Sequence, residues 1–432
     1  MIRSRKRKLL AGGGIGIVGA VVVALGLLVA TERPVLPDRA ADVVPGLDRA
    51  SVARGAGLAR LGYCSVCHTA TGGRAYAGSR PLRTPFGVVY SSNITPDPST
   101  GLGQWSRNAF RRAMRRGISR DGSYLYPAFP YDHYTHVSDR DLDDLQAFLT
   151  TLPPVRSTPP RNRLVFPLGF RPLLAGWDLL FLHPGPVAID PARSVEWNRG
   201  RYLTEGLAHC GGCHTPRNVL GAEKRGRAEA GGWSDGWFAP PLEAHSPALR
   251  SWTAARLFTY LRTGLDRDHA AAAGPMGAVA DQLSRAPEAD VHAIAVYVAS
   301  LMPRPANAGE GPGPDRTDAD VAHPAGAMLF AGACAACHGT GAPMMLVAGR
   351  PALGLGTPLH EDNPRDVIQI ILEGLKPPVG PAGPVMPPFA DSLTDAQVAD
   401  LVGYLRARFD DHGPWPGDLR QAVQAARAAT AP

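Results

Sequence analysis

The chain has no cysteine outside one recurring pattern. Its six cysteines form three copies of Cys-X-X-Cys-His, which run from Cys64 to His68, from Cys210 to His214 and from Cys334 to His338. No cysteine is left for a disulfide, so the fold is not a disulfide framework. A thioredoxin-like redox pair needs no following histidine, and a zinc site needs further ligands at suitable spacing. Neither of these sites accounts for the pattern.

The chain has little net charge beyond its N-terminal tip. The formal charge is +7, but five positive charges precede position nine, at Arg3, Arg5, Lys6, Arg7 and Lys8. The rest of the chain carries only +2. Nucleic-acid binding requires a basic face within a folded domain, not a basic tip. We therefore expect no nucleic-acid partner.

Strand-like alternation of apolar and polar residues is scarce, whereas glycine and proline are abundant. The 432 residues include 49 Gly and 42 Pro, and 44% are hydrophobic. This composition favours short helices joined by turns over continuous sheets. The length exceeds what one core usually organises, so several domains of roughly 100 residues are expected. The sequence therefore predicts an all-α protein with three domains.

Only one apolar run is long enough to cross a membrane. Residues 9–30 are uncharged and follow the basic tip. Such a run spans a bilayer as one helix, and its basic flank keeps the N-terminus in the cytoplasm. We expect an inner-membrane protein with one N-terminal anchor and periplasmic domains; a cleaved signal peptide is the alternative. A second apolar stretch, 164–182, is interrupted by two prolines and two charged residues and predicts a packed linker or docking surface.

The Cys-X-X-Cys-His spacing is typical of covalent haem attachment. Two cysteines three residues apart can bond the two vinyl groups, and the adjoining histidine can direct its imidazole at the iron. The pattern predicts three haem c groups. The attachment residues are Cys64, Cys67, Cys210, Cys213, Cys334 and Cys337, and the proximal iron ligands are His68, His214 and His338.

The chain around each motif repeats. A glycine-containing helix is expected before each motif. Each repeat is expected to end with an amphipathic helix, and an aromatic residue takes the same position in the apolar pattern of all three helices. The glycines are Gly55, Gly200 and Gly326, and the aromatic residues are Phe148, Tyr297 and Tyr404. This pairing resembles the packing of the terminal helices in class I cytochromes c, which implies three small haem domains in series.

These observations divide the chain into seven parts. We predict a cytoplasmic basic tip and transmembrane anchor (or signal peptide) at 1–33 and three cytochrome c domains, here called the first, second and third repeat, at 48–155, 191–305 and 321–410. Linkers are predicted at 156–190 and 306–320, and a C-terminal tail at 411–432.

A further helix is expected in the middle of each repeat, ending at Gly117, Gly264 or Gly374. Counting twelve residues onward from the last two glycines leads to Met276 and Met386. Methionine sulfur is a common sixth ligand of cytochrome c iron. A methionine can also be core filler, but the equal register favours ligation at both positions.

The same count in the first repeat leads to Phe129, which cannot bind iron. Met114, the nearby methionine, is expected to lie in the core because it shares a helix face with Phe110. His133 lies four residues beyond Phe129, and a loop of that length can shift a donor atom by several ångström. We predict His133 as the sixth ligand of the first iron, with His136 as second choice and an open position as third.

Four longer segments resemble one family, the triheme cytochrome c subunits of membrane-bound bacterial dehydrogenases. They are 90–97 (YSSNITPD), 121–131 (DGSYLYPAFPY), 171–177 (RPLLAGW) and 214–217 (HTPR), and the resemblance extends from Ser51 to Phe409. It implies an electron-transfer subunit that takes electrons from a catalytic dehydrogenase subunit and passes them to ubiquinone or a terminal oxidase. Alcohol- and gluconate-type members of this family carry methionine where this chain has Phe129. The sequence around Phe129 looks more like that of cytochromes whose partner is a molybdenum hydroxylase of aldehydes or N-heterocycles.

An enzymatic function is the alternative. A multihaem peroxidase or oxidase would use an open first haem to bind its substrate, and it would need a vacant distal position with polar groups around it. The equivalent placement of Met276 and Met386 favours electron transfer instead.

Overall fold

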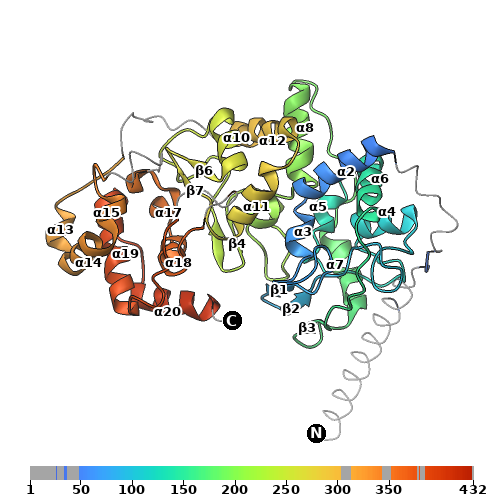
Figure 1. Ribbon diagram of the computed structural model, residues 1–432, viewed down its shortest axis with the longest axis horizontal. Coiled ribbons are helices and arrows are strands. Elements are labelled where there is room, and N and C mark those ends of the chain that lie inside the picture. The colour runs from blue at the N-terminus through green and yellow to red at the C-terminus, as the bar shows by residue number, and fades with distance from the viewer. Residues whose placement is uncertain are drawn as a thin grey trace, which may run out of the picture. The chain divides into compact units, whose positions relative to one another are not determined.

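The computed structural model describes residues 26, 34–36, 48–302, 313–342, 352–376, 379 and 385–430 (Figure 1). The chain divides into two compact units. One comprises Met1–Ala59 and Cys64–Pro186, and the other comprises Arg60–Tyr63 and Val187–Pro432. The first Cys-X-X-Cys-His motif belongs to the first unit, and the second unit contains the other two.

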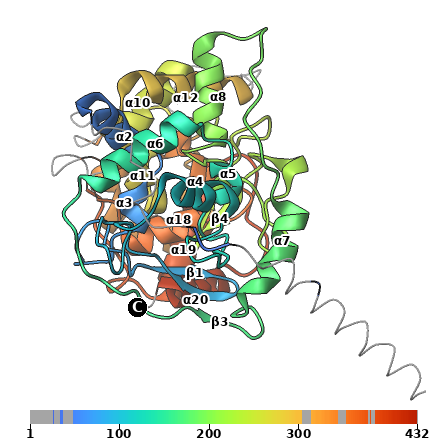
Figure 2. The ribbon, with the colours of Figure 1, turned by 90° about the vertical axis from the view of Figure 1, so that its right-hand side faces the viewer.

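The first repeat and the segment after it contain six described helices and three short strands. They are α2 (Arg49–Leu61), α3 (Cys64–Cys67), β1 (Pro81–Thr84), β2 (Gly87–Tyr90), α4 (Arg107–Arg116), α5 (Tyr131–Tyr134), α6 (Asp139–Thr150), β3 (Arg163–Leu164) and α7 (Leu174–Phe181), with a 3-10 turn at Arg171–Leu173 before α7. Helices α4 and α5 lie side by side (Figure 2).

The second repeat has the same order of helices around two hairpins. Its elements are α8 (Val195–Glu205), α9 (Gly211–His214), a 3-10 turn (Arg225–Arg227), β4 (Gly232–Ser234), β5 (Trp237–Ala239), α10 (Ala254–Thr263), β6 (Leu265–Asp266), β7 (Ala270–Ala271), α11 (Gly274–Ser284) and α12 (Glu288–Leu301).

The third repeat, in its described part, is built from helices and helical turns and has no strand. It contains α13 (Ala319–Ala322), α14 (Pro324–Leu329), a π-helical turn (Phe330–Cys334), α15 (Ala335–His338), a 3-10 turn (Leu353–Leu355), α17 (Thr357–His360), α18 (Arg365–Glu373), α19 (Asp395–Phe409) and α20 (Leu419–Thr430).

The first and last helices of each repeat cross at a glycine, as the sequence predicts. A Cβ atom on Gly55 would lie 1.9 Å from the carbonyl oxygen of Asp144, and one on Gly200 would lie 1.9 Å from that of Ala293. A Cβ atom on Gly326 would lie 2.4 Å from the Cβ atom of Tyr404. Only glycine permits this approach, because any side chain would overlap the facing helix.

The middle helices α4, α10 and α18 end at the expected glycines. Gly117, Gly264 and Gly374 have φ angles of 59°, 70° and 69°, a backbone conformation that strains any other residue. The apolar residues in equivalent register all lie in the core, at Phe110, Leu257, Val367, Met114, Leu261 and Ile371. Met114 is thus a core residue, as predicted.

The prediction of an all-α fold is wrong. Strands β1, β2 and β3 form a three-stranded antiparallel sheet, and β4–β5 and β6–β7 form two hairpins. Pro81 pairs with Tyr90 and Gly87 with Leu164. Each strand has only two to four residues, too few for alternation to appear in the sequence.

The N-terminal transmembrane helix in the predicted fold is likewise not supported. Among the described residues, no helix is long and apolar enough to cross a membrane. The longest of them, α19, has 15 residues, and a span needs about 20. Residues 9–30, on which the prediction rested, lie outside the described residues except for Gly26.

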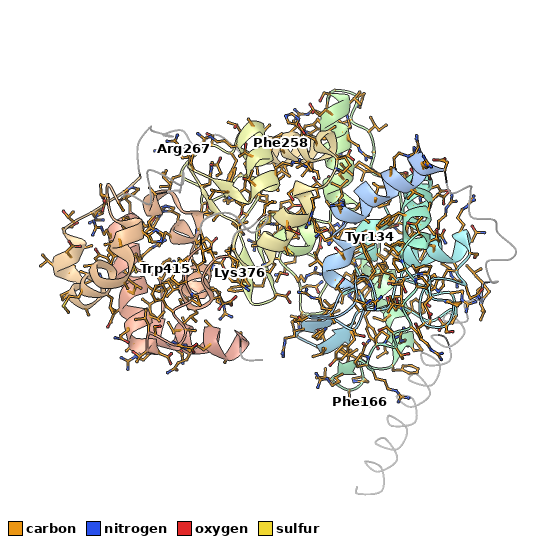
Figure 3. The ribbon with its side chains drawn as sticks, viewed as in Figure 1. Tyr134, Phe166, Phe258, Arg267, Lys376 and Trp415 are labelled. Carbon is orange, nitrogen blue, oxygen red and sulfur yellow. The ribbon has the colours of Figure 1, made fainter. Side chains whose placement is uncertain are left out.

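The residues expected to form a C-terminal tail instead complete the third core. Helix α20 packs on α19 and α18 and buries Val423 and Ala426 completely. Trp415, labelled in Figure 3, is also buried, and its Nε1 donates a hydrogen bond to the carbonyl of Glu361 at 2.7 Å. The third hydrophobic core therefore extends beyond the predicted boundary at residue 410.

The helix crossing in the second repeat can be tested at Gly200. Gly200→Ala should lower the free energy of unfolding by about 1–3 kcal/mol, because the added methyl group overlaps the facing backbone. The matched control is Gly176→Ala in α7, where no heavy atom lies within 4 Å of the new Cβ atom. The control should be neutral or stabilising by up to about 1 kcal/mol. Denaturant unfolding followed by circular dichroism compares them, and equal effects would contradict the crossing.

Candidate haem-binding sites

Each Cys-X-X-Cys-His motif forms about one turn of helix. In the first two repeats the histidine amide donates to the first cysteine carbonyl, from His68 to Cys64 at 2.9 Å and from His214 to Cys210 at 3.0 Å. All six cysteines are half-buried and none is in a disulfide. One helical turn therefore brings two free thiols and an imidazole together in each motif, the arrangement that covalent haem attachment requires.

Burial favours the neutral forms of Cys64 and Cys334 and of His68 and His214. Burial and the neighbouring Cys67 raise the pKa of Cys64 to about 12, and burial raises the pKa of Cys334 to about 11. Burial also lowers the pKa of His68 and of His214, although a hydrogen bond to a backbone carbonyl partly opposes it. A neutral imidazole is the form that binds iron.

Two of the three histidines have a carbonyl acceptor that fixes the ring. Nδ1 of His68 lies 2.7 Å from the carbonyl oxygen of Ser92, and Nδ1 of His214 lies 2.7 Å from that of Pro240. With Nδ1 donating, the lone pair is on Nε2, which is then the nitrogen available to iron. The chain that follows His338, at 343–351, lies outside the described residues. The first two sites thus fit a haem c group.

The two acceptors lie far from their histidines in the sequence. The observed acceptors come 24 and 26 residues after the histidine. Both lie just beyond the second strand of a hairpin, β2 or β5, so the hairpins that the sequence analysis missed deliver the acceptor carbonyl.

A buried polar network holds the acceptor segment of the first repeat. Nδ2 of Asn93 donates to the carbonyl of Val155 at 2.7 Å and to the hydroxyl of Thr100 at 2.9 Å. Its Oδ1 accepts from the amide and the hydroxyl of Thr95. Asn93 and Thr95 are almost fully buried. The segment 90–97 therefore has a structural function: it places the Ser92 carbonyl opposite His68.

In the second repeat, the hairpin β4–β5, which precedes the acceptor Pro240, is held by residues of the third repeat. The amide of Phe238 donates to Oδ1 of Asp366 at 2.9 Å, and Nε of Arg365 donates to the carbonyl of Gly236 at 2.7 Å. Burial raises the pKa of Asp366 to about 6. Because Phe238 lies two residues before Pro240, the orientation of His214 depends on α18 of the third repeat.

The two methionines of equal register lie in different local structures. Met276 lies in the first turn of α11, two residues after Gly274, whose φ is 50° and whose Cβ position lies 2.4–2.8 Å from the indole of Trp237. Met386 forms a reciprocal backbone bridge with Leu375, with both hydrogen bonds at 2.9 Å. Each methionine lies twelve residues after the glycine that ends the middle helix of its repeat, so the count starts at the same structural position in both repeats.

In the first repeat, aromatic residues occupy the equivalent segment. The ring of Phe129 lies 5.3 Å from that of Tyr134, which is buried (Figure 3). Burial and the nearby thiols of Cys64 and Cys67 raise the pKa of Tyr134 well above its usual range. The segment after Phe129 therefore packs next to the haem-attachment residues of the first repeat.

Both candidate histidines follow this aromatic segment. His133 is half-buried in the short helix α5, between Tyr131 and Tyr134. Nδ1 of His136 lies 2.5 Å from the carbonyl oxygen of Gly185. The choice between His133, His136 and an open position stays a prediction.

The third repeat holds one more cluster of potential metal ligands, His360, Asp410 and His412. Nδ1 of His360 lies 2.5 Å from Oδ1 of Asp410, its Nε2 lies 3.1 Å from the Gly354 carbonyl, and Nε of Arg406 lies 2.9 Å from Oδ2 of Asp410. Both nitrogens of His360 face acceptors, and the guanidinium already neutralises the carboxylate. The cluster is therefore a buried ion-pair network.

Comparison with known proteins identifies the family. A cytochrome c family model matches residues 52–153, and the model described as cytochrome C oxidase, cbb3-type, subunit III matches residues 321–405. The fructose dehydrogenase cytochrome subunit of Gluconobacter japonicus is 36% identical over 84% of this chain and 80% of its own length. The gluconate 2-dehydrogenase cytochrome c subunit of Pantoea cypripedii is 36% identical over 88% of this chain and 89% of its own.

The chain belongs to the family of dehydrogenase cytochrome c subunits. A nicotinate dehydrogenase subunit of Pseudomonas putida is 44% identical over 98% of this chain, which spans only 36% of that protein's length. The resemblance expected from the sequence is thereby confirmed. The protein is an electron-transfer component of a dehydrogenase complex and not its catalytic subunit, and its cytochrome c domains imply covalently bound haem c.

The network around Ser92 can be tested at Asn93. Asn93→Ala leaves buried polar groups without partners, which should cost about 1–3 kcal/mol of stability, and releases the Ser92 carbonyl from His68. A histidine without its carbonyl acceptor donates less electron density to iron, so the midpoint potential of the first haem should rise. A potentiometric titration followed by visible absorption measures this shift.

The matched control for this variant is Asn198→Ala. Nδ2 of Asn198 also donates to backbone carbonyls, those of Asp190, Arg193 and Ser194, and none of them faces a motif histidine. The control should lose some stability, but less than Asn93→Ala because Asn198 is only half-buried, and it should not move any potential. Unchanged potentials in both variants would show that Asn93 has no influence on the haem.

Proposed function

We propose that the chain carries three covalent haems and conducts electrons from a periplasmic molybdenum hydroxylase to ubiquinone or a terminal oxidase. The haem count rests on the three motifs, in each of which two free thiols and a histidine lie within about one helical turn. The covalent links would be made by Cys64, Cys67, Cys210, Cys213, Cys334 and Cys337.

The proposed axial ligands make the three haems unequal. His68, His214 and His338 would be the proximal ligands, and Met276 and Met386 the distal ligands of the second and third irons. His133 would complete the first site. A second histidine lowers the reduction potential relative to methionine, so the first haem would have the lowest potential of the three.

The proposed partner class rests on one observation above the others. The relative with 44% identity along 98% of this chain is named as part of a nicotinate dehydrogenase, and nicotinate is an N-heterocycle. This supports a partner that hydroxylates N-heterocycles or aldehydes. The alcohol, fructose and gluconate dehydrogenase relatives are less similar, at 35–36% identity.

We also propose that the haem-bearing repeats lie in the periplasm. The basic residues at positions 3–8 support this location, because a positively charged start is typical of a secretory signal segment, which directs the following chain across the membrane. Ubiquinone and terminal oxidases are membrane components, so electrons would leave the chain near the membrane surface.

The axial ligands can be tested by spectroscopy. Met276→Leu and Met386→Leu should each remove about half of the methionine-to-iron charge-transfer absorption, and the double variant all of it. Met114→Leu is the matched control, because Met114 is buried in the core of the first repeat. Residual charge-transfer absorption in the double variant would refute the assignment.

The ligand of the first iron needs a separate variant. His133→Gly should convert one haem to the high-spin state, and added imidazole should restore the low-spin spectrum. His136→Gly is the comparison, and it should leave all three haems low-spin. If only the His136 variant becomes high-spin, the second choice is correct. Strong carbon monoxide binding by the unmodified protein would instead indicate an open first site.

The partner can be identified from the detergent-solubilised complex. It should contain molybdenum, and an aldehyde or N-heterocyclic substrate should reduce the haems, which a ubiquinone analogue should then reoxidise. A pyridine haemochrome assay on the same sample should give three haems per chain. Copurification with a flavin or quinoprotein dehydrogenase would contradict the proposed partner and leave the haem assignment in place.

A further inference from the structure

The segment that follows the first repeat exposes an unusual number of large apolar side chains. Phe166 is 96% exposed and Leu179 is 86% exposed. The whole set, here called the apolar surface, consists of Val165, Phe166, Phe170, Leu173, Leu179 and Leu180, all at least 36% exposed. Phe166 lies near the start of the loop between β3 and α7 and points away from the ribbon (Figure 3). Several large apolar side chains exposed along one segment are typical of an interaction site.

The inner side of the same segment is firmly attached to the first repeat. The hydroxyl of Tyr131 donates to Oδ1 of Asp178 at 2.7 Å, and the rings of Tyr131 and Trp177 lie 5.9 Å apart. The hydroxyl of Tyr126 donates to the carbonyl of Leu168 at 3.1 Å. The segment therefore has a packed inner side and a separate apolar outer side, so its exposed residues are not an incomplete core.

The loop carrying Phe166 is also fixed at its base. Nη1 of Arg171 donates to the carbonyl of Tyr124 at 2.7 Å, and its guanidinium lies over the ring of Tyr126. Backbone hydrogen bonds from Leu168 to Val165 and from Phe170 to Pro167 close the turn. A loop fixed in this way presents its apolar tip without a large loss of conformational entropy on binding.

The charges beside the apolar surface are basic. Val88 of β2 pairs with Arg83 of β1 and with Arg163 of β3, and residues opposed in this way share one face of the sheet. Both arginines are exposed. Asp178 is the only acidic residue between positions 145 and 189, and it is bonded to Tyr131. The segment 145–189 thus combines protruding apolar groups with arginines, and its one carboxylate is bonded to Tyr131.

We propose that the apolar surface docks onto an anionic lipid bilayer, with Phe166, Leu179 and Leu180 among the acyl chains and Arg83 and Arg163 at the headgroups. Apolar side chains that enter the boundary between headgroups and acyl chains, together with cations beside them, are the two components of peripheral membrane binding. Arginine can keep its charge at the headgroup level while its stem remains in apolar surroundings. This mode of attachment needs no spanning helix, and it does not depend on which dehydrogenase donates electrons.

Photocrosslinking on the full chain with its haems tests this proposal directly. The protein with p-benzoylphenylalanine in place of Phe166 is reconstituted with vesicles of phosphatidylcholine, with or without phosphatidylglycerol, and irradiated. Lipid adducts should form at position 166 and should be most abundant with phosphatidylglycerol. The matched control has the same group in place of Val219, which is 91% exposed in the second unit and should give no lipid adduct.

The electrostatic part of the proposal has its own pair of variants. Arg163→Gln should reduce the adduct yield in anionic vesicles about fivefold, the effect expected for one arginine near such a surface. Arg267→Gln is the control, because Arg267 is also highly exposed but lies in the second unit (Figure 3). It should leave the yield unchanged.

Several results would overturn the proposal. They are equal lipid labelling at positions 166 and 219, no labelling at 166, or labelling of a dehydrogenase subunit instead of lipid in the intact complex. The haem spectrum of each sample is recorded in parallel. Loss of lipid adducts with all haems intact would refute the lipid surface alone and leave the proposed electron transfer untouched.

Discussion

The close crossing of the first and last helices is the constraint on which each repeat depends. At Gly55, Gly200 and Gly326 the facing backbone or Cβ atom leaves no space for a side chain. The chain leaves the first helix only a few residues before the haem motif. The crossing thus determines where the thiols and the proximal histidine stand relative to the last helix, and every later element of the repeat is placed around them.

Short hairpins place a carbonyl oxygen opposite the motif histidine, which the helices do not provide. Ser92 follows β2 and Pro240 follows β5, and each faces Nδ1 at 2.7 Å. The two acceptors are stabilised differently: buried side chains hold Ser92 within its own repeat, whereas Asp366 of the third repeat supports the strand that precedes Pro240. Ligand orientation in the second repeat is therefore coupled to the packing between repeats.

Features that depend on the spacing of nearby residues could be predicted from the sequence. Contacts between segments that are distant in the sequence could not. The Cys-X-X-Cys-His motifs, the glycine crossings and the buried register of Phe110, Leu257 and Val367 all follow from periodicity, and the structure contains them. The acceptor carbonyls could not be located from the sequence, because pairing of short strands brings Ser92 and Pro240 next to histidines that lie 24 and 26 residues earlier. The Asp235-Gly236 turn between β4 and β5 was an available hairpin signal.

The first repeat departs from the other two in two connected ways. Phe129 stands where they have methionine, and two residues later Tyr131 packs against Gly117, at the end of the middle helix. Tyr131 also binds Asp178 of α7, the helix that carries Leu179 and Leu180 of the apolar surface. One buried tyrosine thus links the segment that holds the candidate sixth ligand to the proposed lipid-binding surface. A change at that surface would therefore reach the segment around Tyr131 through Asp178.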